Sequence, residues 1–462
     1  MIRALALALA IAAAPAASLA QEPHAPRSGS VQRSGGDARA PSTPPRPIPD
    51  YGRPPPAPDP AEALLWIPRV LFFPLHLVLE YGVRRPIGWL LRTVELERLD
   101  ALFVQGMPQL DRPEGEWGFV PLLRYDHGLV ASVGLGFRVR DAARTRWLRV
   151  RIEGWPMDQL AGLARGTVLV GPARVTLELS GGWRDDRVYH GLGWSTSQAS
   201  RARYAHARGD ASLFVEVRPW RRSRVAGGVR AGVHRFGDSD FAREGDLSIE
   251  QAIARGEVTR PPGYPQGYTL VEPWVRAVLD SRDPEEWPHA SGARVELGVG
   301  WGVDAEQGVA SSWARTAARV DLALEVMRDR TLRLRGMTEL VFPLAHRAIP
   351  FTEQVWLGGS LDRMPGFLLG RLIGESAASV GLSWRYAIWS WMDAEIFVDV
   401  GNAFGPHLRD FDVDRLRVSF GTALLTSDPE DFSLLVAFGT EPFVLGAEVS
   451  SVRFAIAIGA PP

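Results

Sequence analysis

The chain has 462 residues, a formal net charge of −1 and no cysteine. Because acidic and basic residues nearly balance, nothing in the composition indicates a nucleic-acid partner. The lack of cysteine excludes a disulfide framework, a zinc–thiolate site and a lipid-modified cysteine after an export signal. The printed sequence contains no lysine, so every cation that is permanently charged is an arginine.

The first segment, residues 1–20, has the features of a secretory signal peptide. Arg3 gives it a charged start, an apolar run covers residues 4–14, and Ser18-Leu19-Ala20 forms a small-residue cleavage site before Gln21. Such a segment is too short and wrongly flanked to be a membrane span. We therefore expect the chain to be exported and the signal to be cleaved.

Two segments of different composition follow the signal. Residues 21–60 are rich in Pro, Gly, Ser, Arg and Ala, and their few apolar residues predict a disordered linker. Residues 61–104 are more apolar, and Asp59-Pro60 before them and Pro86 within them predict a segment of two short helices. These helices could lie in a membrane interface or plug a barrel, and the sequence leaves both open.

From about residue 117 onward, apolar and polar residues alternate repeatedly. Val320 and Leu322, for example, are interleaved with Arg319 and Asp321. Alternation of this kind indicates strands with one apolar and one polar face. Consecutive strands carry charges of both signs on the polar face, at the roughly ten-residue length that spans a membrane at barrel tilt. We predict an all-β fold, a transmembrane antiparallel β-barrel of about sixteen strands over residues 117–459.

Two further features bear on this architecture. The chain after the signal has no clean run of about 18 apolar residues, so a helical-bundle membrane protein is not expected. A membrane-inserted backbone must then close its hydrogen bonds as a barrel. Residues 236–268 and 344–374 are the longest connections, and we expect them to be external loops, because bacterial barrels have short periplasmic turns.

Five short motifs follow one another along the predicted barrel. The most specific is a D-x-R-D…P…G hairpin, formed by Asp280, Arg282, Asp283, Pro288 and Gly292. The others are an opening hairpin, an aromatic-x-G-x-G strand, the start of a long loop and an F-x-D-x-G strand: Phe119-Val120-Pro121 with Tyr125, Tyr189 to Gly193, Gly358 to Phe367, and Phe397 to Phe404. Together they resemble the barrel of the BamA/TamA family of outer-membrane assembly proteins, the bacterial surface antigen superfamily.

This resemblance implies a barrel in the Gram-negative outer membrane that helps to insert or translocate outer-membrane proteins or lipid. In the family, periplasmic POTRA domains precede the barrel, and a weakly paired seam between the first and last strands admits client strands. The seam would join residues 117–125 to residues 451–459. We recognise no POTRA pattern before the barrel. The implied partners are outer-membrane lipid and lipopolysaccharide, client outer-membrane proteins or a POTRA-bearing partner.

The long loop departs from the family pattern. The resemblance implies an arginine directly before Gly-Phe that reaches into the lumen and pairs with acidic residues on the following strands. Here Met364-Pro365 stands before Gly366 and Phe367, and Arg363 is set back. Either Arg363 pairs with Asp399 from a shifted loop, or the lock between loop and wall is weakened. Proline itself can neither carry charge nor donate a hydrogen bond.

Motifs for catalysis, a cofactor or a metal site were not found. Asp126-His127 could activate water, but adjacent strand residues point to opposite faces, and a hairpin turn explains the pair better. We therefore expect no enzyme activity. The alternative to an assembly barrel is a passive pore or a structural barrel. The two differ in whether residues 344–374 and 61–104 fill the lumen.

Overall fold

The computed structural model describes most of the predicted barrel. It describes residues 117–459 except for 142–144, 156–158, 241–245, 284–287, 390–391 and 427–431, and nine isolated positions between 66 and 85. The predicted signal peptide (1–20) and linker (21–60) lie outside the described residues, as does most of the predicted helical segment 61–104. Among the described residues, no helix has the length and hydropathy that crossing a membrane requires.

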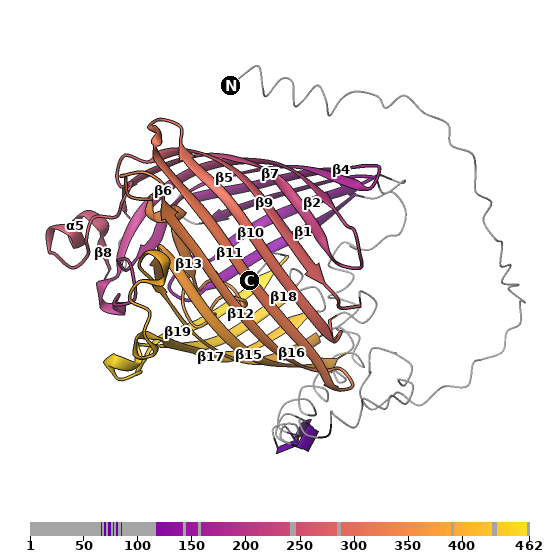
Figure 1. The fold of residues 1–462 in the computed structure, drawn as a ribbon. Coiled ribbons are helices and arrows are strands. Elements are labelled where there is room, and N and C mark those ends of the chain that lie inside the picture. The colour runs from indigo at the N-terminus through magenta and orange to yellow at the C-terminus, as the bar shows by residue number, and fades with distance from the viewer. Residues whose placement is uncertain are drawn as a thin grey trace, which may run out of the picture. The chain divides into compact units, whose positions relative to one another are not determined.

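Sixteen long strands make up the described barrel, which confirms the predicted fold class (Figure 1). Seven of them precede the first long connection: β1 (Trp117–Asp126), β2 (Ser132–Arg140), β3 (Arg146–Trp155), β4 (Gln159–Val170), β5 (Ala173–Tyr189), β6 (Ala202–Val217) and β7 (Arg224–Asp238). Nine follow it: β9 (Tyr268–Asp280), β10 (Gly292–Asp304), β11 (Gly308–Met327), β12 (Arg330–Pro343), β15 (Ser376–Trp389), β16 (Met392–Phe404), β17 (Arg417–Thr426), β18 (Phe432–Thr440) and β19 (Val449–Ile458).

The strands form one closed sheet. Each strand pairs antiparallel with the next one along the chain, and β19 pairs antiparallel with β1 to close the ring. Closure gives each long strand a paired neighbour on both sides, which is how a β-structure satisfies its backbone hydrogen bonds in lipid. A two-residue strand, β8 (Leu247–Ser248), pairs in parallel with the first two residues of β6, Ala202 and Arg203.

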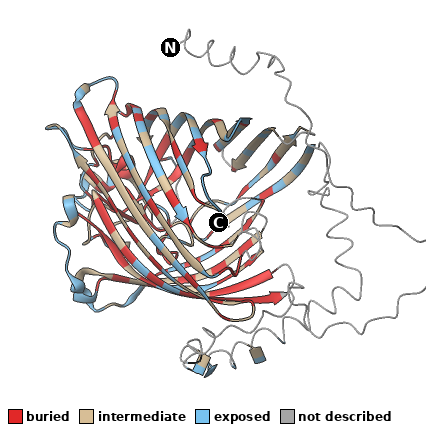
Figure 2. Cartoon of the chain, turned by 45° about the vertical axis from the view of Figure 1, so that its right-hand side comes forward, coloured by how far each residue is buried: buried red, intermediate tan, exposed pale blue. Residues whose placement is uncertain are grey.

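The outer surface of the ring is apolar. On β11, Val320 and Leu322 are 42% and 44% exposed and point outward, whereas Arg319 and Asp321 line the lumen. The same alternation of buried and exposed positions runs along the other strands (Figure 2). A wall with large apolar side chains outside and charges inside has the exterior of a membrane-spanning barrel.

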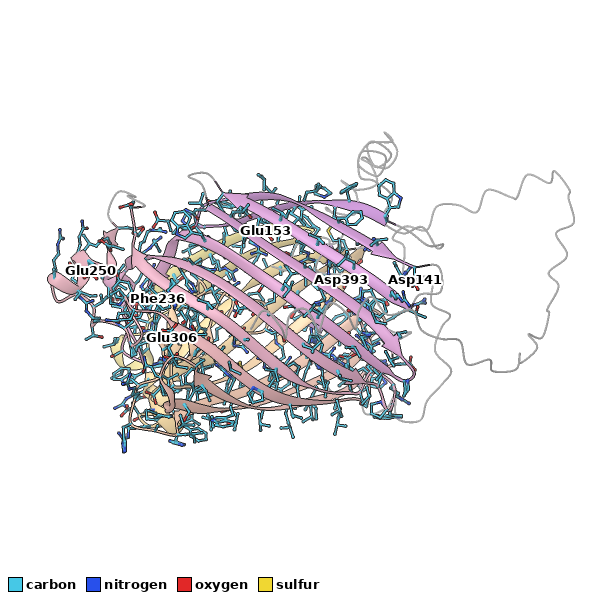
Figure 3. All side chains as sticks on the ribbon, turned by 90° about the horizontal axis from the view of Figure 1, so that it is seen from above. Asp141, Glu153, Phe236, Glu250, Glu306 and Asp393 are labelled. Carbon is cyan, nitrogen blue, oxygen red and sulfur yellow. The ribbon has the colours of Figure 1, made fainter. Side chains whose placement is uncertain are left out.

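The two ends of the barrel differ. Both long connections predicted as loops leave the same end, one between β7 and β9 and one between β12 and β15. The first contains a short helix, α5 (Ile249–Ala254), whose N-terminus is capped by a reciprocal Ser248–Gln251 capping box. Glu250 and Glu306 mark this long-loop end in Figure 3, and Asp141 and Asp393 lie toward the short-turn end. By the rule of short periplasmic turns, the long-loop end is the external one.

Candidate functional site

The connection between β12 and β15 folds inside the barrel; we call residues 344–375 the sixth loop. It contains a 3₁₀ turn, η4 (Phe351–Glu353), and a small hairpin of β13 (Val355–Leu357) and β14 (Leu372–Gly374). Its buried apolar side chains share one core with inward-facing residues of the wall: Val355, Leu357, Met364, Phe367 and Leu372 pack with Tyr268, Leu270, Trp313, Met337 and Val341. The loop is therefore a packed part of the lumen.

One side of the sixth loop is fixed to the wall by Glu353, whose side chain is 2% exposed. Its carboxylate accepts hydrogen bonds from Arg230 of β7 (3.1 Å), Arg315 of β11 (3.3 Å) and the Tyr268 hydroxyl of β9 (2.7 Å). Burial alone would raise the pKa of Glu353, but the two guanidinium groups and the Tyr268 hydroxyl hold it below its usual range. This residue is ionised at neutral pH and ties the loop to three strands.

Of the two alternatives for the long loop, the ion pair between Arg363 and Asp399 is wrong. Arg363 Nη2 lies 2.9 Å from Glu339 Oε2 on β12, and its Nη1 donates to the Trp356 carbonyl at 3.0 Å. Asp399 lies instead 3.4 Å from Arg335 Nη2. The reason is the path of the loop, which brings Arg363 to Glu339 of β12, while Arg335 of the same strand reaches Asp399.

Gly366 and Phe367 form the tip of the loop, and they contact the last strands of the barrel. The Gly366 N–H donates to Ser419 Oγ (2.7 Å), and its carbonyl accepts from Ser451 Oγ (2.8 Å). A Cβ at Gly366 would collide with the Phe438 backbone. The Phe367 ring is fully buried against Gly439, where no side chain is in its way. Glycine is needed at position 366 because the loop backbone touches the β18 backbone there.

The charged residue that holds the tip of the sixth loop in place belongs to the barrel wall. Arg453 of β19 donates from Nη1 to the Pro365 carbonyl (3.1 Å) and from Nη2 to the Gly359 carbonyl (3.2 Å). The same guanidinium holds the Asp126 carboxylate at the end of β1, with Nε at 2.9 Å from Oδ1 and Nη2 at 2.7 Å from Oδ2. A single buried arginine therefore joins the last strand, the first strand and the loop tip.

Arg453 and Asp126 bridge the shortest strand pairing of the barrel. Strands β1 and β19 share four paired positions, from Leu123↔Ile458 to Asp126↔Ala455, whereas the other neighbouring pairs in the described ring share seven to fifteen. We call this pairing the seam. Pro121 lies just beyond it on β1 and has no N–H to donate. Few hydrogen bonds and one buried ion pair thus close the ring.

The D-x-R-D motif forms a separate structure at the short-turn end. Arg282 donates to both carboxylate oxygens of Asp280, at 2.9 and 2.8 Å, and reaches Asp321 of β11 at 3.2 Å. Asp283 and Pro288 lie in the connection that follows, and Gly292, at a φ of +139°, starts β10. This motif braces the β9–β10 turn and takes no part in the loop–seam contacts.

Sequence reasoning missed Arg453 and gave Asp126 only a turn role. A signal was present, because Arg453 is the one charged residue in the strand Val449–Ile458. Its inward neighbours Ser451, Ala455 and Ala457 are small and uncharged. A lone buried charge on an otherwise uncharged strand needs a partner, and closing the ring brings in the first strand to provide it.

The comparison with solved structures supports the architecture. No family model and no curated protein matches the sequence. Among solved structures, BamA from Haemophilus ducreyi lacking POTRA domains 1–3 matches with a TM-score of 0.52 and 11% identity, over 75% of this chain and 70% of that one. CdiB from Escherichia coli matches with a TM-score of 0.50 and 11% identity, over 74% of this chain and 63% of that one. Identity this low establishes the fold alone: the chain has the barrel fold shared by BamA and CdiB.

Proposed function

We propose that the chain is an outer-membrane barrel of a Gram-negative cell that helps to insert or translocate outer-membrane proteins or lipid by opening its seam. The observation that carries this proposal is the four-residue pairing of β1 with β19. Each backbone hydrogen bond contributes only about 1 kcal/mol net. A seam with so few of them is the place where the ring opens at least cost.

The stagger of the seam strands supports a role in strand exchange. Residues 117–122 of β1 extend past the end of β19 on the short-turn side, so their seam-side edge has no strand partner among the described residues, and Gly459 alone lies against it, at Pro121. A free strand edge is a template on which another strand can add. A client strand arriving from the periplasm would meet this edge first and could pair with it as the seam opens.

The packed sixth loop supports an assembly barrel over the alternative of a passive pore. Its core is continuous with the lumenal wall, and Glu353, Arg363 and the Gly366 tip attach it to walls on different sides. An open channel would need this loop to leave the lumen. We propose outer-membrane lipid and lipopolysaccharide as surroundings, and client outer-membrane proteins or a POTRA-bearing partner as protein partners, with no catalytic step.

The test uses the purified chain in liposomes. A small outer-membrane barrel diluted from urea serves as the client, and its folding is followed by the gel-mobility shift of folded barrels. We expect faster client folding than in protein-free liposomes, and small single-channel currents from the same preparation. Client folding at the protein-free rate together with large, steady currents would contradict the proposal and favour the passive pore.

A further inference from the structure

The lumen beside the seam holds a chamber rich in arginine. Two hollows of about 430 and 240 Å³, which share lining residues, lie between the sixth loop, the seam and strands β3 to β7. Both are lined by the same set of basic side chains: Arg124, Arg184, Arg187, His206 and Arg208. We call the two hollows together the arginine chamber.

Arginines on the opposite wall are matched by carboxylates. Arg315 lies 3.2 Å from Glu339 and also contacts Glu272 and Glu353. Arg333 likewise pairs with Asp321. Such pairing is what a polar barrel interior ordinarily requires, because buried charges are costly unless paired. Positive charge there is balanced within the protein.

The arginine chamber lacks this balance. Arg184 is held by Asp186 at 2.6 Å and Arg124 lies 3.8 Å from Glu153 (Glu153 is labelled in Figure 3). In contrast, no hydrogen bond or ion pair joins the guanidinium of Arg187 or of Arg208 to another described residue, and Arg187 Nε is buried. The carboxylates that line the two hollows already have other basic partners: Glu153 with Arg124, Asp126 with Arg453, and Glu353 with Arg230. The guanidinium groups of Arg187 and Arg208 therefore face the larger hollow without an ion-pair partner among the described residues.

The local backbone explains why Arg187 faces the chamber. The pairing of β5 with β6 shifts register between Arg184, opposite His206, and Arg187, opposite Tyr204. A bulge of this kind redirects side chains and is common next to functional sites. It brings Arg184 and Arg187 onto the same hollow although they are three residues apart, where a regular strand would place them on opposite faces.

We propose that Arg187 and Arg208 bind a phosphate group in the arginine chamber. The planar guanidinium fork matches phosphate oxygens, and Arg187, whose Nε is buried without a partner, gains most from a bound anion. Arg208 is exposed and adds a second fork on the same hollow. Leu129 and Leu369 also line the larger hollow, so an acyl-bearing phosphate has an apolar surface beside its headgroup. The phosphate could belong to a lipid headgroup or be free in solution.

The experiment measures binding to the folded, full-length chain in phosphate-free, zwitterionic detergent. Inorganic phosphate and a short-chain phosphatidic acid are titrated calorimetrically into wild type and into the Arg187→Gln/Arg208→Gln variant. The matched control is Arg294→Gln, which removes a lumenal arginine that pairs with Glu296 at 2.6 Å. The single variant Arg208→Gln, at an exposed position, covers the case in which the double variant does not fold.

We expect saturable phosphate binding that weakens about tenfold or more in the double variant, less in Arg208→Gln and not in the control. Tighter binding of phosphatidic acid than of inorganic phosphate would identify a lipid headgroup as the source, and equal binding would identify free phosphate. No binding of either probe, or the same loss in Arg294→Gln, would overturn the proposal. This inference stands apart from the proposed function, because binding requires only the closed barrel and no client.

Discussion

Replacing Arg453 by glutamine should open the seam. The side chains of Arg453 and Asp126 are 2% and 12% exposed, so the change leaves a buried carboxylate and two loop carbonyls without their donor. Breaking a buried ion pair costs about 3–5 kcal/mol. For the free-energy cost of breaking this pair we take the lower value, about 3 kcal/mol, because Asp126 borders the arginine chamber and can reach water there. At about 1.4 kcal/mol per tenfold, the open fraction of the seam rises about 100-fold.

Amide hydrogen exchange of the barrel in liposomes measures this fraction directly, because exchange at the seam follows its local opening equilibrium. Peptides that cover residues 123–126 and 455–458 should exchange about 100-fold faster in Arg453→Gln, whereas β10 peptides should not change. Asp126→Asn should have a similar effect, and the double variant should add little to either. Seam exchange that stays at the wild-type rate, or that rises equally in Arg294→Gln, would refute the assignment of Arg453 as the lock.

Three further predictions concern the sixth loop. Gly366→Ala should lower the free energy of unfolding in urea by about 1–3 kcal/mol, because the added Cβ meets the β18 backbone. The control Gly336→Ala, where the added Cβ meets open space, should leave the free energy of unfolding unchanged. Equal effects of the two substitutions would contradict the contact. The stabilisation from ionised Glu353 should be complete above the usual glutamate pKa, about 4.3. It should be lost as the pH falls through the pKa of Glu353 in the folded protein, which is lower. Wild type should therefore lose more stability than Glu353→Gln between pH 5 and pH 3. Arg363→Ala, which cuts the link to Glu339, should make single-channel currents larger and noisier; unchanged currents would mean that this link does not hold the loop.

The barrel could be predicted from the sequence because its strands are encoded locally. Alternation such as Arg319, Val320, Asp321 and Leu322 requires an apolar outside and a charged inside, and the repeated pattern specifies the number of strands. The D-x-R-D hairpin could be placed for the same reason, since Asp280 and Arg282 are two residues apart. Structure that depends on near neighbours is visible in the sequence.

The lone charge of Arg453 is visible in the sequence, but its pairing with Asp126 could not be predicted, because the two residues are distant in the chain. Asp126 and Arg453 are 327 residues apart and meet only when the ring closes. The choice of Glu339 rather than Asp399 as the partner of Arg363 depends on how the sixth loop crosses the lumen, and no local periodicity encodes that path. The unpaired arginines of the chamber likewise appear only once their neighbours in space are known.

A disulfide across the seam tests the central claim most directly. Leu123 and Ile458 are paired positions, within the reach of a disulfide, and the chain has no other cysteine to interfere. The matched control places the same bond between Leu297 and Ala318, paired on β10 and β11. We predict that the oxidised Leu123→Cys/Ile458→Cys barrel no longer speeds client folding, that a reductant restores this activity, and that the control bond has no effect. A seam-locked barrel that remains as active as wild type would contradict the account.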